Sequence, residues 1–173
     1  MANNNEGEVE NLSHEEAIEK MQELVKHNGI CLFTTQVADA PLHTRPMETQ
    51  QVDDKGNFWF ISGDDSDKNS EIMEDNQVQL FYSNPSASEF MSVYGNASIS
   101  RDKNKISELW SPIAKAWFKD GKDDSRLTVI KVTPEEAYYW DTKSNKMVAM
   151  IKILAAMVSG KSIDDGVEGK MTI

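Results

Sequence analysis

Two short stretches of the sequence carry positive side chains that could hold an anion. Arg45 lies in a β-like run, and the triplet Ser66-Asp67-Lys68 stands where a loop is expected to enter a helix. An arginine offers a planar fork of donors that suits phosphate or another anion. A hydroxyl, an ammonium and the free N–H groups of a helix start can also bind phosphate together. Either these groups form one anion site, or Arg45 pairs with a surface acid and Lys68 is solvated.

Pro46 limits how the strand that contains it and Arg45 can pair. Proline has no backbone N–H, so such a strand lies at a sheet edge, at a bulge or beside a groove. A turn over Asp53–Asn57 separates this run from the next one, FWFIS (Phe58–Ser62). If the two runs are neighbouring strands, that turn brings Arg45 and Lys68 into one neighbourhood.

The sequence gives little support for nucleic-acid binding, for a metal site or for a catalytic side chain. The formal net charge is -11 and no cluster of lysine and arginine offsets it, which argues against nucleic-acid binding. The three histidines, His14, His27 and His43, have no ligand partner at i+3 or i+4, so we expect no metal site. Cys31 lies in the apolar run ICLF and is expected to be a small core residue. No residue stands out as a catalytic acid, base or nucleophile.

Length and composition fit one globular domain. The chain has 173 residues, of which 39% are hydrophobic and 27% charged. No run reaches the roughly 20 apolar residues of a membrane span, and the acidic start MANNNEGEVEN does not resemble a secretory signal, so we expect a cytoplasmic location. We divide the chain into a flexible segment over 1–12, a domain over 13–160 and a polar, loose tail over 161–173.

The pattern of the sequence predicts mainly β structure with helices at the ends and in between. A capping box at Ser13 and Glu16 begins an amphipathic helix that ends at Asn28-Gly29. Gly95 predicts a bulge or a close backbone approach inside a long strand. Strands are expected over 30–35, 42–52, 58–62, 78–83, 90–101, 127–134 and 135–141, and further helices over 67–76, from 102 across Pro112 to Gly121, and over 146–160. This series is typical of a β-barrel with added helices.

The order of short motifs along the chain carries a further signal. Each motif is weak alone, but nine occur in one order between residues 13 and 160: RPM (45–47), DDKGNFWFIS (53–62), SDK (66–68), VQLFYS (78–83), SVYGNA (92–97), ELWSP (108–112), WFKDG (117–121), LTVIKVTP (127–134) and AYYWD (137–141). This succession resembles the general stress protein branch of the pyridoxamine 5'-phosphate oxidase-like, FMN-binding split barrels.

The resemblance implies a six-stranded antiparallel split β-barrel with flanking helices. It implies a homodimer that holds two FMN molecules in clefts between the subunits. By the same resemblance, Arg45 and Lys68 hold the FMN phosphate and Ser66 donates a hydroxyl. Backbone groups around Met47, Ile61 and Ser62 would bond the polar edge of the flavin ring, and Phe60 would form part of its wall. Pro46 would leave its strand open to the flavin.

Two tryptophans are candidates for a contact across the dimer. Trp117, and with less support Trp110, could approach the ring from the partner subunit; core packing is the alternative for both.

Departures from the oxidase pattern limit what reaction the resemblance implies. The stretch Leu109–Ile113 lacks the arginine with which pyridoxamine phosphate oxidases hold their substrate phosphate. Two hypotheses remain. One is an FMN-dependent oxidoreductase with a nicotinamide or other donor, and the other is a flavin-binding or flavin-sensing stress protein without turnover. Binding of haem or of a deazaflavin is a third possibility. A haem would need a histidine as its iron ligand, and His43 is the only histidine inside the predicted barrel strands.

Overall fold

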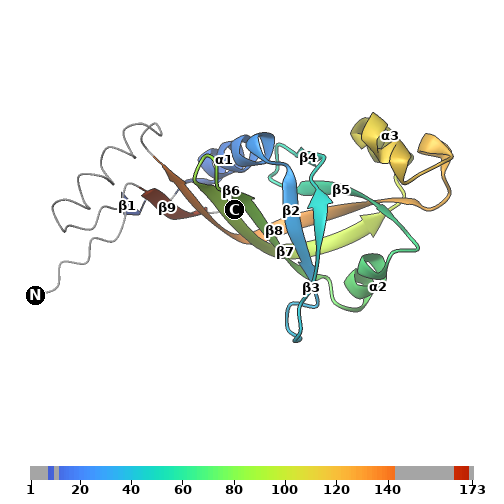
Figure 1. Cartoon of the computed structure of the whole chain (residues 1–173), viewed down its shortest axis with the longest axis horizontal. Helices are drawn as coiled ribbons and strands as arrows, with labels where there is room; N and C mark the ends of the chain where they lie inside the picture. Colours follow the sequence, from blue (N-terminus) through green and yellow to red (C-terminus); the bar gives the residue numbers. More distant parts are fainter. Residues whose placement is uncertain (1–7, 10–11, 143–165, 172–173) are drawn as a thin grey trace, which may run out of the picture.

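The computed structural model describes residues 8–9, 12–142 and 166–171 (Figure 1). The helix expected over 146–160 lies outside these residues. None of the helices within them is long and apolar enough to cross a lipid bilayer. The elements are β1 (Glu8–Val9), α1 (His14–His27), β2 (Ile30–Thr35), β3 (His43–Glu48), β4 (Gln51–Val52), β5 (Phe58–Gly63), α2 (Asp67–Glu74), β6 (Gln77–Asn84), β7 (Glu89–Ser100), α3 (Lys103–Leu109), the 3₁₀ turns η1 (Pro112–Ala116) and η2 (Gly121–Asp123), β8 (Leu127–Thr142) and β9 (Gly166–Met171).

One antiparallel sheet coils into a half-open barrel, which confirms the predicted split-barrel fold. The strands follow the order β3-β2-β6-β7-β8, and β5 then pairs with the first half of β8 and with β4. The second half of β8 pairs with β9. Six strands, β2, β3, β5, β6, β7 and β8, make the barrel, and the short β1 and β4 and the strand β9 extend it. Within the described residues β3 pairs only with β2 and is an edge strand, as Pro46 requires.

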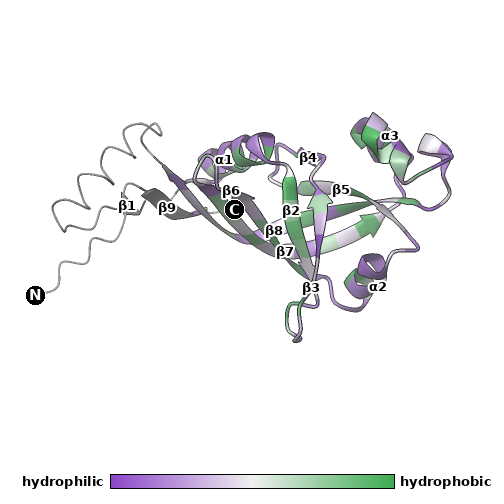
Figure 2. Ribbon diagram, in the orientation of Figure 1, coloured by the Kyte–Doolittle hydropathy of each residue, from purple (hydrophilic) through white to green (hydrophobic). Residues whose placement is uncertain are grey.

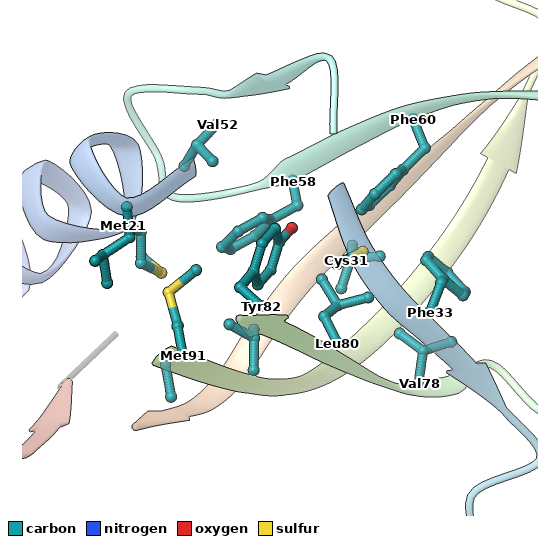
Figure 3. Packing of buried hydrophobic residues seen from close by; sticks show 14 of the residues in the cluster. Met21, Cys31, Phe33, Val52, Phe58, Phe60, Val78, Leu80, Tyr82 and Met91 are labelled. Carbon is teal, nitrogen blue, oxygen red and sulfur yellow. The ribbon is translucent and has the colours of Figure 1, made fainter. Parts of the chain in front are cut away.

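The barrel core is filled by side chains that alternate along the strands (Figure 3). On β5, Phe58, Phe60 and Ser62 point inward, because successive residues of a strand face opposite sides. The ring of Phe33 meets the ring of Phe60 edge to face, with 5.1 Å between their centroids. Cys31 is buried in this core, as expected. A second, smaller cluster under α3 and η1 covers the opposite face of β5 and β8, so these two strands are buried on both sides.

Helix α1 begins with the predicted capping box. The backbone N–H and the hydroxyl of Ser13 both donate to the Glu16 carboxylate, at 3.0 and 2.6 Å. Ala17 and Met21 on one face are fully buried against the barrel, while the charged face is solvated.

Two strand predictions were wrong in their boundaries, for identifiable reasons. The run 42–52 is two strands: β3 pairs with β2, but β4 pairs with β5, and the chain changes partner at Thr49 and Gln50. The runs 127–134 and 135–141 are one strand, β8. Pro134 is tolerated inside it because it faces the bulge at Gly95 and falls between the stretches of β8 that pair with β5 and β9.

The helix expected from 102 to Gly121 is also shorter in the structure. Helix α3 ends at Leu109, and Pro112 begins a separate 3₁₀ turn. Ser111 is extended, with ψ of 153°, because the proline ring clashes with a helical residue before it.

The two terminal segments also differ from the expectation of loose chain. Residues 166–171 form β9, and Met171 is buried in the barrel core. Glu8–Val9 pairs with β9 in parallel as β1. The apolar side chain of Met171 in an otherwise polar tail was a signal for β9 that sequence reasoning missed. Its burial in the core stabilises the pairing of β9 with β8.

Candidate functional site

A pocket of about 350 Å³ opens between the edge strand β3, the end of β5, the start of α2 and the segment that carries η1. Its size is within the range of small-molecule sites in proteins. Its walls combine apolar side chains with a few charged ones. It is lined by Pro46, Met47, Glu48, Gln50, Ile61, Ser62, Gly63, Asp65, Ser66, Lys68, Ser111, Ala114, Trp117, Phe118 and Arg126.

Most of the residues predicted from the sequence lie in this pocket. Pro46, Met47, Ile61, Ser62, Ser66, Lys68 and Trp117 all line it, although they come from four separate segments of the chain. These segments meet where the edge strand β3 passes the end of β5, because α2 begins shortly after β5. Of the residues predicted to contact FMN, Arg45, Phe60 and the less supported Trp110 do not line the pocket.

Phe60 requires a correction. Its side chain is fully buried in the barrel core against Phe33 and therefore cannot form a wall of the pocket. The strand alternation places Ile61 on the opposite face of β5, and Ile61 lines the pocket instead.

The loop before α2 holds its hydroxyl groups in a buried network. The Ser66 hydroxyl donates to the carbonyl of Gly63 at 2.7 Å and lies 3.2 Å from Asn69 Oδ1. The Ser62 hydroxyl donates to the same Asn69 oxygen at 2.7 Å, and Asn69 Nδ2 donates to Thr128 on β8 at 3.0 Å. Asn69 was not predicted, but it fixes the loop in place because it is buried and both its Oδ1 and Nδ2 atoms are hydrogen-bonded.

Lys68 supplies a cation at this end of the pocket. Its side chain is half-buried, and burial lowers the pKa of its ammonium group, as does the nearby positive charge of Arg45. Within the part of the chain that the structure describes, Lys68 has no salt bridge closer than 4.0 Å. Arg45 and Lys68 lie in one neighbourhood because Arg45 pairs with Glu71, three residues after Lys68 on α2. The strand of Arg45, β3, does not itself pair with β5, so a shared helix and not the turn between neighbouring strands brings them together.

Arg45 is engaged by an acid of α2. Its Nη2 atom lies 2.7 Å from Glu71 Oε2, and its Nη1 atom donates to the Thr35 hydroxyl at 2.5 Å. His43 Nδ1 lies 2.7 Å from the other Glu71 oxygen. Burial alone would raise the pKa of Glu71, but hydrogen bonds from Thr35, His43 and Arg45 lower it from 4.5 to about 2. The pairing of Arg45 with an acid, one of the two alternatives considered for this residue, is thus the arrangement in this structure.

Two other residues named as candidates also do not line the pocket. His43, the candidate haem ligand, bonds Glu71 and does not line the pocket. Trp110 packs on Phe118 with 6.4 Å between ring centroids, in the cluster under α3. Trp117 lines the pocket of its own chain and is 66% exposed.

Sequence reasoning missed the second cation of the pocket, Arg126. Its guanidinium pairs with Asp124 at 3.0 Å and with Asp65 at 3.2 Å. The hydrogen bonds that Arg126 donates to Asp124 raise the pKa of Arg126 and lower the pKa of Asp124. The close spacing of Asp124 and Arg126 in the sequence could have indicated that these two residues pair. The pairing of Arg126 with Asp65 could not be predicted in this way, because Asp65 lies far away in the sequence.

The model of one protein family matches most of the chain. The family is described as pyridoxamine 5'-phosphate oxidase like, and the match runs over residues 16–164. The chain belongs to this family. The match confirms the resemblance on which the predicted fold rested.

One curated protein and several solved structures match this chain at low sequence identity. Protein bli-3 of Neurospora crassa is 24% identical in an alignment of 157 residues that covers 85% of this chain and 75% of that protein. A crystal structure assigned as a general stress protein 26 from Jannaschia sp. CCS1 superposes with a TM-score of 0.77 at 21% identity, over 91% of this chain and 99% of that one. The general stress FMN/FAD binding protein from Xanthomonas citri superposes with a TM-score of 0.64 at 24% identity, over 75% of this chain and 92% of that one.

The residues present in the pocket suit a flavin mononucleotide. One end offers a helix start and the ammonium of Lys68, which has no salt bridge to any carboxylate among the described residues, and this suits a phosphate. The other walls include Pro46, Met47, Ile61 and Trp117, beside polar residues such as Glu48 and Gln50, and the apolar side chains suit a flat aromatic ring. The edge strand β3 leaves backbone groups around Met47 unpaired by any described strand, and these could bond the polar edge of such a ring.

Proposed function

We propose that this family member binds FMN in the pocket between β3, β5 and η1. The observation that carries the proposal is Lys68: a half-buried ammonium at the first turn of α2, without a salt bridge among the described residues, beside an apolar slot. An ammonium that has lost solvent is stabilised by an anion, and a terminal phosphate provides one. The general stress FMN/FAD binding protein of Xanthomonas citri, which shares the fold, supports this choice of ligand.

In the proposed complex the charged residues bind the phosphate and the strand residues contact the ring. Lys68 and Arg45 attract the phosphate, and Arg45 reaches it by leaving Glu71 or by sharing its guanidinium between the two anions. The Ser66 hydroxyl donates to phosphate only if it leaves the carbonyl of Gly63. Backbone groups of Met47, Ile61 and Ser62 orient the ring, and Pro46 keeps the strand edge open to it.

Exposed apolar side chains support the proposal of a homodimer. Leu32 on β2 faces Phe81 on β6, and Phe90 on β7 faces Trp140 on β8; all four are 38 to 50% exposed. Strand β2 is among the most hydrophobic segments in Figure 2. A contiguous apolar surface of this kind is typical of a subunit interface. Light scattering on the purified protein should give twice the mass of the 19.5 kDa chain.

We further propose that the bound flavin takes part in electron transfer with a small molecule. Flavin supplies the redox chemistry, while the protein supplies orientation and electrostatics. Trp117 and Phe118 narrow the pocket and limit the access of water to the ring. Pyridoxamine phosphate oxidation itself is not proposed, because Leu109–Ile113 lacks the phosphate-binding arginine of that reaction.

A stopped-flow experiment separates an enzyme from a binding protein. The FMN-loaded protein is mixed with NADH or NADPH without oxygen, and the loss of flavin absorbance is followed. Rapid bleaching, and recovery when an acceptor such as a quinone is added, supports the oxidoreductase. Flavin that stays oxidised with every donor supports the second candidate, a stress protein that stores or senses FMN.

A further inference from the structure

Arg126 joins three segments that surround the pocket. It stands just before β8, and its backbone N–H and its Nε both donate to Asp124 Oδ1 at 3.1 Å. Its Nη2 donates to Asp124 Oδ2 at 3.0 Å and to the carbonyl of Trp117 at 3.2 Å. Its Nη1 donates to Asp65, in the loop that precedes α2, at 3.2 Å.

The charge of Arg126 is already matched by carboxylates. Asp124 is buried and Asp65 is exposed, and both pair with the guanidinium. An arginine in this state is a weak candidate for a further anion site. Its side chain instead makes four hydrogen bonds, to Asp124, Asp65 and the Trp117 carbonyl, that connect chain segments, which a planar fork does better than an ammonium.

The segment that Arg126 holds carries the aromatic wall of the pocket. The guanidinium carbon lies 5.6 Å from the centroid of Phe118, whose ring is buried. Trp117 is largely exposed, and its carbonyl is bonded to Arg126. The backbone around these residues forms short 3₁₀ turns with local bonds, such as Trp117 N–H to the Ala114 carbonyl at 3.0 Å, and not a continuous helix. The bond from Arg126 to the Trp117 carbonyl therefore ties the turns to β8 and to the loop before α2, which their own local bonds do not do.

We infer that Arg126 is a positioning residue that fixes the Trp117–Phe118 wall against the loop before α2 and so sets the width of the ring end of the pocket. This inference rests on the proposed function, because the ring end is defined by the flavin. The proposed function rests on the phosphate end of the ligand, whereas this inference concerns the end that would hold the ring. Lys68 acts on the phosphate, whereas Arg126 acts on the ring.

The test compares FMN with riboflavin, which has the ring but no phosphate. Dissociation constants for both are measured by flavin fluorescence with wild type, Arg126→Gln, Arg126→Lys and the control Arg101→Gln. Arg101 is a matched control, since it bonds Asp64 and the carbonyl of Ser125 nearby but does not line the pocket. Both Arg126 variants should weaken FMN and riboflavin by the same factor, about tenfold, and Arg101→Gln by less than twofold.

A second readout works without any flavin. Amide hydrogen exchange of peptides covering residues 111–124 should be at least several times faster in both Arg126 variants than in wild type or Arg101→Gln, while exchange in β6 and β7 stays unchanged. If residues 111–124 exchange as slowly in Arg126→Lys as in wild type, a positive charge alone suffices, and the inference is overturned. Unchanged exchange in Arg126→Gln would overturn it as well. If the wild type binds neither flavin, the proposed function fails, and hydrogen exchange alone decides the role of Arg126.

Discussion

The Arg45–Glu71 pair makes a quantitative prediction about stability and pH. Replacing Glu71 by glutamine keeps the size of the side chain but removes its charge. The pKa of Glu71 falls from 4.5 to about 2 in the folded protein, because hydrogen bonds from Thr35, His43 and Arg45 outweigh burial. One pKa unit corresponds to about 1.4 kcal/mol, so a fall from 4.5 to about 2 corresponds to at most about 3.5 kcal/mol of stabilisation by the charged form.

Solvent reduces this figure. The Glu71 side chain is 12% exposed, but Arg45 is 25% and His43 48% exposed, so the charges are partly screened. We therefore expect a difference of about 1–2 kcal/mol between wild type and Glu71→Gln at pH 7. A carboxyl whose folded pKa is lowered stabilises the fold above its unfolded pKa, and this stabilisation disappears as the pH falls through the folded pKa. The difference should thus be complete above about pH 5 and should shrink between pH 4.5 and pH 2.

Urea unfolding at pH 7, 5, 4 and 3 measures this difference directly. Glu74→Gln is the matched control, since Glu74 lies on the same helix and accepts a long, 3.4 Å hydrogen bond from Gln36. It should change the free energy of unfolding little at any of these pH values. A Glu71→Gln difference that stays constant from pH 7 to pH 3 would refute the proposed network.

Three further predictions concern binding and the barrel. Lys68→Ala should weaken FMN binding by about 1.5–3 kcal/mol, as a charged hydrogen bond is lost, and should leave riboflavin binding unchanged in the same fluorescence titration. Arg45→Ala should weaken FMN binding by a similar amount and also lower the thermal midpoint, because Glu71 loses its partner; unchanged FMN affinity in both variants would count against the phosphate site. Gly95→Ala should destabilise the fold by about 2–4 kcal/mol in calorimetry, since its methyl group would overlap the carbonyl oxygen of Thr133, and a neutral effect would show that the bulge is adaptable.

Local signals in the sequence predicted much of the fold. Strand β2 matched its expected residues 30–35, the capping box at Ser13 formed, and Gly95 lies at a bulge. Each of these features depends on residues close in the chain. Pro112 also carried a readable signal, because the residue before a proline is driven out of the helical region.

Features that depend on tertiary neighbours were beyond local reasoning. No local pattern shows that β8 passes from β5 to β9 at Pro134, or that Asp65 meets Arg126. The burial of Phe60 is a different case. Alternation along FWFIS already separated it from Ile61, so its assignment to the pocket wall could have been avoided.

Equilibrium titration of FMN with the purified, flavin-free protein tests the central claim most directly. If Lys68 and the apolar slot form a flavin site, the fluorescence of FMN is quenched to a saturating level with one flavin per chain, and riboflavin binds more weakly. FMN fluorescence that remains unchanged at protein concentrations up to the high micromolar range would contradict the account.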